Sequence, residues 1–303
     1  MCRNQGGKRS SMPPDDVIGA HALSPAAIVA AIDARAERIE TPCGSGSMIW
    51  RRWGPRSGAS PALVLLHGGY GSWTHWLRNV ESLAARYRVL ACDLPGLGES
   101  ADVAKPYSAE SLAAIVAEGI DRVAPDNNVA MCGFSFGAVI GGHVAARMGT
   151  RVSSLLLLGA AGLGLPRKPL DLTRVEPGMA PDEIAEVQRG NLVKLMFGDA
   201  RRVDDLAVHL QNENTRRGRL DSRPIAFTDT LVSTLPKASA RLGAIWGEQD
   251  ATAANAIEQN FAVLRKLRPG VYCDTIAEAG HWAQWEQPAA FEAKLTAFIE
   301  GKV

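Results

Sequence analysis

The chain has 303 residues, 46% of them hydrophobic, and 33 basic residues against 32 acidic ones give a net charge of +1. This length and composition suit one large core with an inserted subdomain. The near-neutral charge gives no electrostatic reason to expect nucleic acid or a membrane surface as a partner, so we expect a small-molecule substrate.

The five cysteines are scattered, without C-x-x-C or Cys/His spacing. We therefore expect reduced thiols in a cytoplasmic protein and no metal site. No apolar stretch follows the basic residues at the N-terminus, and none reaches the length of a membrane span, so we expect a soluble protein without a secretory signal. The oligomeric state stays open, and a homodimer is one option.

The first elements are predicted from local composition. Residues 1–23 are polar and rich in Gly, Ser and Pro, which predicts a loose tail. Ser24 followed by Pro25 is typical of a helix start, and the Ala/Ile/Val-rich pattern extends the helix to about Ile39. Alternating bulky residues from Ser45 to Trp53 predict an opening β-hairpin.

From Ala62 onward, apolar runs alternate with helical patterns. This alternation is typical of a mostly parallel sheet with helices on both faces. The predicted strands are Ala62–His67, Arg88–Asp93, Val129–Phe134, Val152–Gly159, Leu242–Gly247 and Val271–Ile276. The predicted helices are Trp76–Tyr87, Ala109–Val123, Phe136–Met148, Ala253–Leu267 and Pro288–Glu300.

The alternation stops between residues 162 and 241, where the sequence becomes charged, helix-like and interrupted by prolines. A segment of this length is too long for a loop, so it predicts a small helical cap. The sequence thus predicts an α/β core, residues 24–161 and 242–303, with the cap at 162–241 inserted after strand 6 of the sheet. That position places the cap at the carboxyl edge of the sheet, where ligands bind in open α/β folds.

Gly133-Phe134-Ser135-Phe136-Gly137 lies between a predicted strand and a predicted helix. This is the setting of a G-x-S-x-G nucleophile elbow, in which the serine stands at the start of a helix and glycines avoid collisions with neighbouring backbone. A serine hydroxyl needs a base, so the motif predicts an acid and then a histidine later in the chain. Ser135 is therefore the candidate nucleophile.

The candidate acid and base follow in that order. Asp250 lies in the loop after the strand Leu242–Gly247, and His281 lies in the loop after Val271–Ile276. Both loops leave the carboxyl ends of parallel strands, on the same edge as Ser135, so these residues form the predicted catalytic triad. Glu248 is the alternative acid.

An oxyanion hole needs two backbone N–H groups aimed at one point. The residue after the nucleophile, Phe136, supplies one, and we assign the other to Gly69 in the glycine-rich loop His67-Gly68-Gly69-Tyr70-Gly71. The predicted substrate pocket contains Phe134, Tyr70 and Trp282. His67 and His75 are expected to serve another function, and the turn from Asp93 to Ser100 is interpreted as structural.

Together these motifs resemble the α/β-hydrolase superfamily from about residue 40 to the C-terminus. His281-Trp282-Ala283-Gln284-Trp285-Glu286 resembles more particularly the histidine segment of the meta-cleavage product hydrolases, which cut C–C bonds in ring-opened dienoates. The resemblance implies the α/β-hydrolase fold and a cofactor-free hydrolase that works through an acyl-enzyme or through direct attack by water.

The sequence differs from that subfamily at the positions with which the subfamily binds its substrate. Phe134 and Phe136 stand where the family has asparagine and methionine, and Trp73-Thr74-His75-Trp76 stands where it has an asparagine. The family's cap arginine would fall at Ala207–Gln211, which contains no arginine. The nearest substitutes are Arg201, Arg202, Arg216 and Arg217.

Three functions remain compatible with the sequence. The first is a hydrolase acting on a small, largely apolar ester or thioester, and the second is a C–C hydrolase of the meta-cleavage type. The third is a non-enzymatic small-molecule-binding protein on the same fold. Cofactor-free perhydrolases share the full triad, so a perhydrolase side activity also stays open.

Overall fold

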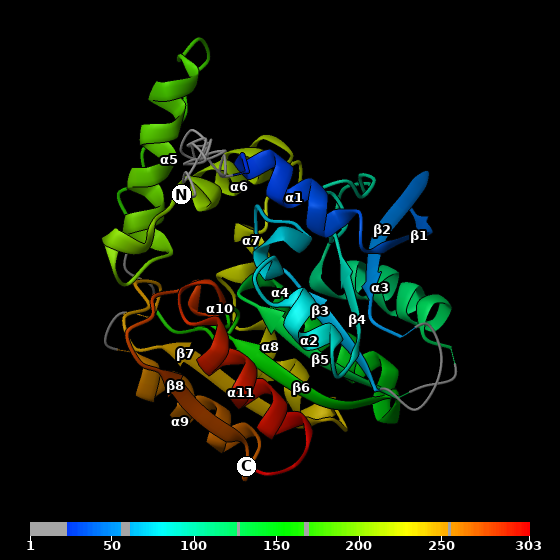
Figure 1. The fold of residues 1–303 in the computed structure, drawn as a ribbon. Helices are drawn as coiled ribbons and strands as arrows, with labels where there is room; N and C mark the ends of the chain where they lie inside the picture. The colour runs from blue at the N-terminus through cyan, green and yellow to red at the C-terminus, as the bar shows by residue number, and fades with distance from the viewer. Residues whose placement is uncertain (1–22, 56–60, 126–127, 167–169, 254–255) are drawn as a thin grey trace, which may run out of the picture.

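The computed structural model describes residues 23–55, 61–125, 128–166, 170–253 and 256–303. Its centre is an eight-stranded sheet in the order β1-β2-β4-β3-β5-β6-β7-β8 (Figure 1). The first two strands pair antiparallel to each other, β2 pairs antiparallel to β4, and all other pairs are parallel. The strands are β1 Glu37–Cys43, β2 Gly46–Trp53, β3 Ala62–Leu66, β4 Arg88–Cys92, β5 Val129–Phe134, β6 Val152–Leu158, β7 Arg241–Gly247 and β8 Tyr272–Ile276.

Helices cover both faces of the sheet (Figure 1). Side chains of α3, α4 and α9 pack in one buried cluster, and those of α2 and α11 pack in a second cluster on the opposite face. The core helices are α1 Pro25–Asp33, α2 Val80–Ala84, α3 Ala109–Val123, α4 Phe136–Met148, α9 Ile257–Leu267, α10 Ala283–Glu286 and α11 Pro288–Ile299. Two short 3-10 helices accompany them, η1 Trp73–Trp76 and η2 Gly149–Arg151. The predicted α/β class with a mostly parallel sheet is therefore confirmed.

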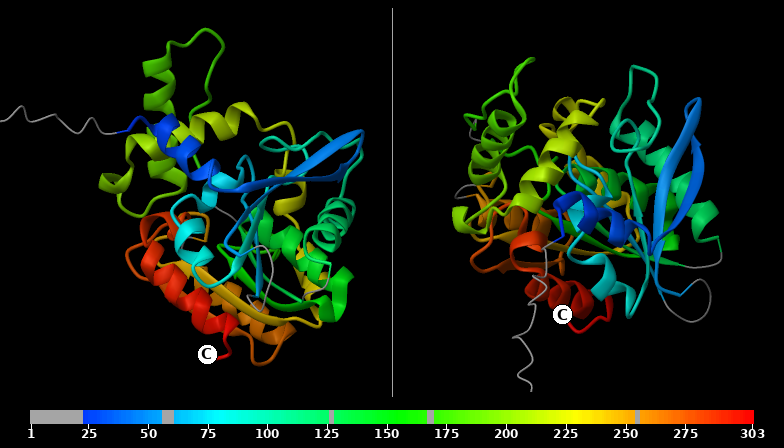
Figure 2. Two further views of the ribbon diagram at one scale, coloured as in Figure 1. Left: turned by 45° about the vertical axis from the view of Figure 1, so that its right-hand side comes forward. Right: turned by 45° about the horizontal axis from the view of Figure 1, so that its top comes forward.

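We call residues 159–240, between β6 and β7, the cap, and its first described helix begins at Pro181. Its helices are α5 Pro181–Leu195, η3 Ala200–Arg202, α6 Asp205–Arg216, α7 Arg223–Ala226, α8 Thr230–Thr234 and η4 Leu235–Lys237. The helix α5 stands apart from the sheet, whereas α6 lies beside α1 (Figure 2). Arg241, the last residue of the predicted cap, belongs to β7.

The predicted helix from Pro25 to about Ile39 is too long, because α1 ends at Asp33 and β1 begins at Glu37. Residues of β1 alternate between exposed and more buried positions and pair with β2, as in Ile39 opposite Trp50. The opening hairpin thus consists of β1 and β2 and begins earlier than predicted. Pairing between strands overrides the local helical preference of this stretch.

Other boundaries shift by smaller amounts. The helix predicted over Trp76–Tyr87 is shorter, since α2 spans Val80–Ala84 and Trp76 is the last residue of η1. Asn79, just before α2, donates its side-chain amide to the carbonyl of Gln284 at 3.1 Å. The helix predicted from Ala253 begins at Ile257. The predicted tail, residues 1–23, lies outside the described residues except for Leu23.

The strand order positions the site. The chain passes from β3 to β4 on one side and then returns to β5 on the other side of β3. Loops at such a reversal diverge and leave a crevice at the carboxyl edge of the sheet. Leu66, at the end of β3, pairs with Gly133 of β5, so the loop after β3 and the turn at Ser135 are neighbours.

Candidate active site

Ser135 occupies a strained turn between β5 and α4. Its φ of 52° lies in the left-handed region, which a non-glycine residue rarely adopts, and its N–H donates to the carbonyl of Leu158 at 2.8 Å. A Cβ on Gly133 would lie 2.4 Å from the carbonyl oxygen of Gly137, and one on Gly137 would lie 2.3 Å from that of Leu66. The flanking glycines therefore let the backbones of β3, β5 and α4 approach closely around the turn that holds Ser135.

Asp250 and His281 form a buried pair at the ends of β7 and β8. The Nδ1 atom of His281 is 2.8 Å from Oδ2 of Asp250, and the Thr252 N–H and hydroxyl both donate to Oδ1 at 2.8 Å. Burial alone would raise the pKa of the Asp250 carboxyl, but His281 and Thr252 together outweigh it, so this pKa is lowered. Glu248, the alternative acid, is exposed and accepts the hydroxyl of Thr275 instead.

The imidazole of His281 lies beside the serine turn. A Cβ on Gly159, the residue after Leu158, would be 3.1 Å from the ring, and the ring of Phe134 lies 4.9 Å away between centroids. Among the described residues this ring bonds only through Nδ1, to Asp250 and Thr252. Its Nε2 atom is therefore left to accept a proton, as a general base requires, and such catalytic hydrogen bonds often tighten only with substrate present.

Two buried histidines fix the glycine-rich loop after β3. His67 Nε2 accepts the N–H of Leu94 at 2.8 Å, so its Nδ1 donates to the Gly68 carbonyl at 2.7 Å, and Nδ1 of His75 accepts the Gly68 N–H at 3.2 Å. In a trans peptide the C=O of Gly68 and the N–H of Gly69 point in opposite directions. The N–H of Gly68 is occupied by His75, whereas the N–H of Gly69 has no partner among the described residues. Its part in an oxyanion hole stays a prediction.

Because of the same two histidines, we expect the folded protein to lose stability in acid. Burial is the first cause that holds the pKa of His75 well below its ordinary value, and burial also lowers the pKa of His67. Below about pH 6.5 the unfolded chain binds protons that the native chain excludes, so each histidine removes up to about 1.4 kcal/mol of stability per pH unit. Urea unfolding at about pH 7.5 and about pH 5.5 should show this loss, and His75→Asn, which can still accept the Gly68 N–H, should reduce it. An unchanged pH dependence in His75→Asn would contradict the buried, neutral state.

The predicted pocket residues lie at different depths. Phe134 and Trp282 are fully buried, and Trp282 donates its indole N–H to the His75 carbonyl at 2.9 Å. Tyr70, also with a positive φ of 50°, directs its hydroxyl to Asp221 of the cap at 3.2 Å. Phe134 and Trp282 therefore form the wall behind the loop and the histidine, and Tyr70 joins the loop to the cap. Their contact with substrate stays a prediction.

Glu286 joins the histidine loop to the cap, a role that the sequence did not reveal. Its carboxylate accepts the backbone N–H groups of Gly280 at 2.6 Å, Gly198 at 3.0 Å and Asp199 at 3.2 Å. Three N–H groups on one buried carboxylate hold these two segments together, because charge-assisted hydrogen bonds are among the stronger ones. His281, next to Gly280, is thereby held against the cap.

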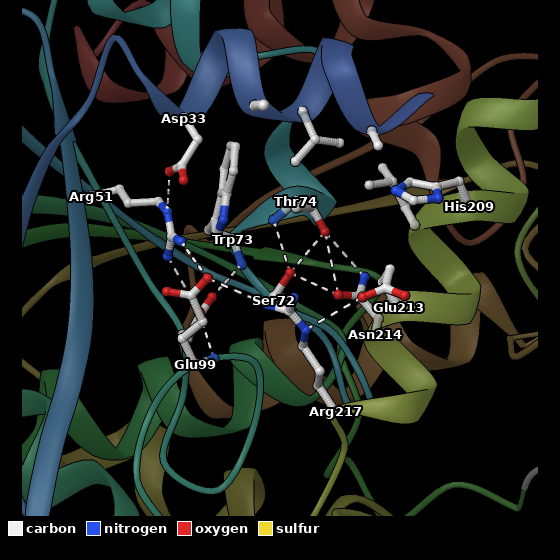
Figure 3. Close-up of a pocket in the computed structure, with 15 residues that line it drawn as sticks. Asp33, Arg51, Ser72, Trp73, Thr74, Glu99, His209, Glu213, Asn214 and Arg217 are labelled. Carbon is white, nitrogen blue, oxygen red and sulfur yellow. Dashed lines mark hydrogen bonds and ion pairs between the residues drawn. The ribbon is translucent and has the colours of Figure 1, made fainter. Parts of the chain in front are cut away.

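A cavity of about 330 Å³ lies between α1, η1 and α6 (Figure 3). None of the predicted catalytic residues lines it, so it is separate from the triad. Buried hydrogen bonds run along it from Ser72 to Asn214 of α6 at 2.7 Å and from Asn214 to Thr74 at 3.1 Å. Asp93 also lines it and accepts the N–H of Trp73 at 2.8 Å, which is the structural role expected for that turn.

The described residues contain neither a metal-binding cluster nor a membrane-spanning helix. No group of three or more His, Cys, Asp or Glu side chains among them is arranged to hold a metal ion. No helix in the described ranges has both the length and the apolar character needed to cross a membrane.

Comparisons with known proteins identify the family of this chain. A family model described as the alpha/beta hydrolase family matches residues 63–294. The chain is 29% identical over 257 residues to a 2-hydroxy-6-oxononadienedioate/2-hydroxy-6-oxononatrienedioate hydrolase of Cupriavidus pinatubonensis, covering 78% of this chain and 86% of the relative.

Solved structures show the same fold at low identity. A membrane phospholipase A, described as a bacterial virulence factor, gives a TM-score of 0.73 at 24% identity and covers 91% of this chain and 90% of its own. Naproxen esterase from Bacillus subtilis gives a TM-score of 0.72 at 21% identity, with 92% and 99% covered. With the family match extending from β3 into α11, the chain belongs to the alpha/beta hydrolase family.

Proposed function

We propose that the chain is a cofactor-independent serine hydrolase in which Ser135 is the nucleophile, His281 the general base and Asp250 the residue that orients the histidine. The observation that carries this proposal is the buried pair of Asp250 and His281, whose Oδ2 and Nδ1 atoms are 2.8 Å apart, beside a serine held at positive φ. A strained serine beside a histidine that a buried carboxylate orients is the arrangement that nucleophilic catalysis needs.

The reaction on an ester follows from this geometry. The Ser135 oxygen attacks the carbonyl carbon while Nε2 of His281 takes the hydroxyl proton, and the N–H groups of Gly69 and Phe136 stabilise the oxyanion. Phe136 is the first residue of α4, where N–H groups have no acceptor within the helix. The histidine then passes the proton to the leaving alcohol, and water, activated by the same histidine, hydrolyses the acyl-enzyme.

A fluorophosphonate probe tests this proposal directly. The wild-type protein should be labelled covalently, and Ser135→Ala should not, because the probe reacts only with an activated serine. Ser153→Ala, in β6 and away from the turn, is the matched control and should be labelled like wild type. Absence of labelling in the wild type would favour a binding protein that keeps the residues without the activity.

For the substrate we propose a small, largely apolar carboxylic ester. Phe134 and Phe136 flank the nucleophile and are both buried. The four arginines considered as carboxylate anchors each pair with an acid: Arg201 with Asp199 at 2.7 Å, Arg202 with Glu278 at 3.1 Å, Arg216 with Glu213 at 2.8 Å and Arg217 with Glu99 at 3.4 Å. The charge of each of these arginines is thus already partly balanced by an acid, which weakens its attraction for a dienoate carboxylate.

The second candidate is a C–C hydrolase, favoured by the dienedioate hydrolase relative and by the segment from His281 to Glu286. We expect kcat/KM for a short p-nitrophenyl ester to exceed that for a ring-fission dienoate, because burying an unpaired carboxylate costs several kcal/mol. Both substrates should be measured on one preparation. A dienoate preferred by about tenfold or more would contradict the ester assignment, and alanine variants of the four arginines would then locate the anchor.

A further inference from the structure

Ser222, in the cap, places its hydroxyl against Gly69. A Cβ built on Gly69 would lie 2.3 Å from the Ser222 oxygen and 3.7 Å from the Cβ of Phe136. Gly69 is not among the glycines with positive φ, so the close approach of Ser222, rather than backbone conformation, requires glycine at this position. The serine hydroxyl thus fills the space that a side chain on Gly69 would take, next to both predicted oxyanion donors.

The hydroxyl of Ser222 lacks a partner in the described part of the chain. The residue is 4% exposed and precedes α7, but its side chain makes no capping hydrogen bond there, and no other described group bonds to its oxygen. Its oxygen is not among the fully buried unpaired atoms of the described residues, so it keeps some access to solvent and to a bound molecule. An unpaired donor beside an oxyanion site is therefore suited to a substrate atom.

The segment around Ser222 is held firmly to the core. Asp221 accepts the Tyr70 hydroxyl at 3.2 Å and donates its N–H to the Tyr107 oxygen at 3.3 Å. Arg223 binds the Asp221 carboxylate with two nitrogens at 2.8 and 2.9 Å, and these hydrogen bonds are the main cause that lowers the pKa of Asp221 to about 2. Asp221 therefore stays ionised at ordinary assay pH, and the position of its neighbour Ser222 does not depend on pH there.

We propose that the Ser222 hydroxyl is a third hydrogen-bond donor to the carbonyl oxygen of the substrate, supplied by the cap beside the N–H groups of Gly69 and Phe136. This inference rests on the proposed serine hydrolase function. A hydroxyl can rotate toward the negative charge as it develops, so the bond is stronger in the transition state than in the bound substrate.

Ser222→Ala tests the inference on the full-length protein with a p-nitrophenyl ester. We expect kcat to fall roughly 10- to 100-fold with KM changed by less than about threefold, because the lost bond acts mainly in the transition state. A trifluoromethyl ketone, which forms a tetrahedral oxyanion on Ser135, should bind more weakly by the same factor as kcat/KM falls. The product carboxylic acid should bind as it does to wild type.

The control is Ser233→Ala, which removes an exposed cap hydroxyl bonded to the Thr230 carbonyl and should leave these values unchanged. An active Ser222→Ala enzyme, or a loss confined to KM or to thermal stability, would overturn the inference. Fluorophosphonate labelling distinguishes failure of the proposed function from failure of the inference about Ser222. An unlabelled wild type refutes the proposed function, whereas a labelled wild type with a fully active Ser222→Ala refutes only the role of Ser222.

Discussion

Ser135→Ala and His281→Ala should each lower kcat by roughly 10⁴- to 10⁶-fold, and the double variant should be little worse than either single one. Without the hydroxyl the histidine has no proton to take, and without the imidazole the hydroxyl stays a poor nucleophile. The two groups act as one unit, so the second substitution removes nothing that the first has left. Steady-state kinetics on a p-nitrophenyl ester measures all three variants.

His143→Ala is a matched control for the histidine. His143 is buried in α4, the helix that begins directly after Ser135. Its Nε2 atom bonds to Thr230 at 2.8 Å and not to the predicted triad. Its loss can lower stability, whereas kcat of the folded fraction should stay near the wild-type value. Losses that simply multiply in the Ser135/His281 double variant would show that the two residues act independently and would refute the triad.

Local signals in the sequence located the elements nearest to the nucleophile. The predicted bounds of β5, α3 and α4 agree with the structure at both ends. Ser108 caps α3 through its side chain, and Ser135 alone stands between the end of β5 and the start of α4, with a glycine two residues to either side. Start and stop signals of this kind act within a few residues, so one sequence is enough to read them.

Long-range pairing explains what the sequence did not reveal. Nothing in the helix-like stretch before Ile39 indicates that Trp50 will lie opposite it in a hairpin. That the three residues of the predicted triad lie at the same edge of the sheet is predictable, because each follows the carboxyl end of a parallel strand. The partners of Glu286 and the contact of Ser222 with Gly69 are not, because they depend on how the cap folds back over the core.

Asp250→Asn should lower kcat by roughly 10⁴-fold while the protein stays folded, and Thr252 supplies the reason. Thr252 donates both its N–H and its hydroxyl to Oδ1 of Asp250 at 2.8 Å. An amide at this position must keep its oxygen toward these two donors, because its NH2 group would oppose them. The NH2 group is then directed at Nδ1 of His281.

An NH2 group facing Nδ1 makes this nitrogen an acceptor, so the imidazole proton moves to Nε2, and Nε2 can no longer accept the proton of Ser135. The defect therefore lies in the tautomer and not in the fold. Circular dichroism and urea unfolding check folding, and steady-state kinetics measures kcat. Glu248→Gln is the matched control and should retain nearly full activity, since Glu248 bonds to Thr275 on the exposed side of the sheet edge. A crippled Glu248→Gln beside an active Asp250→Asn would instead make Glu248 the acid and leave the buried pair with a structural role alone.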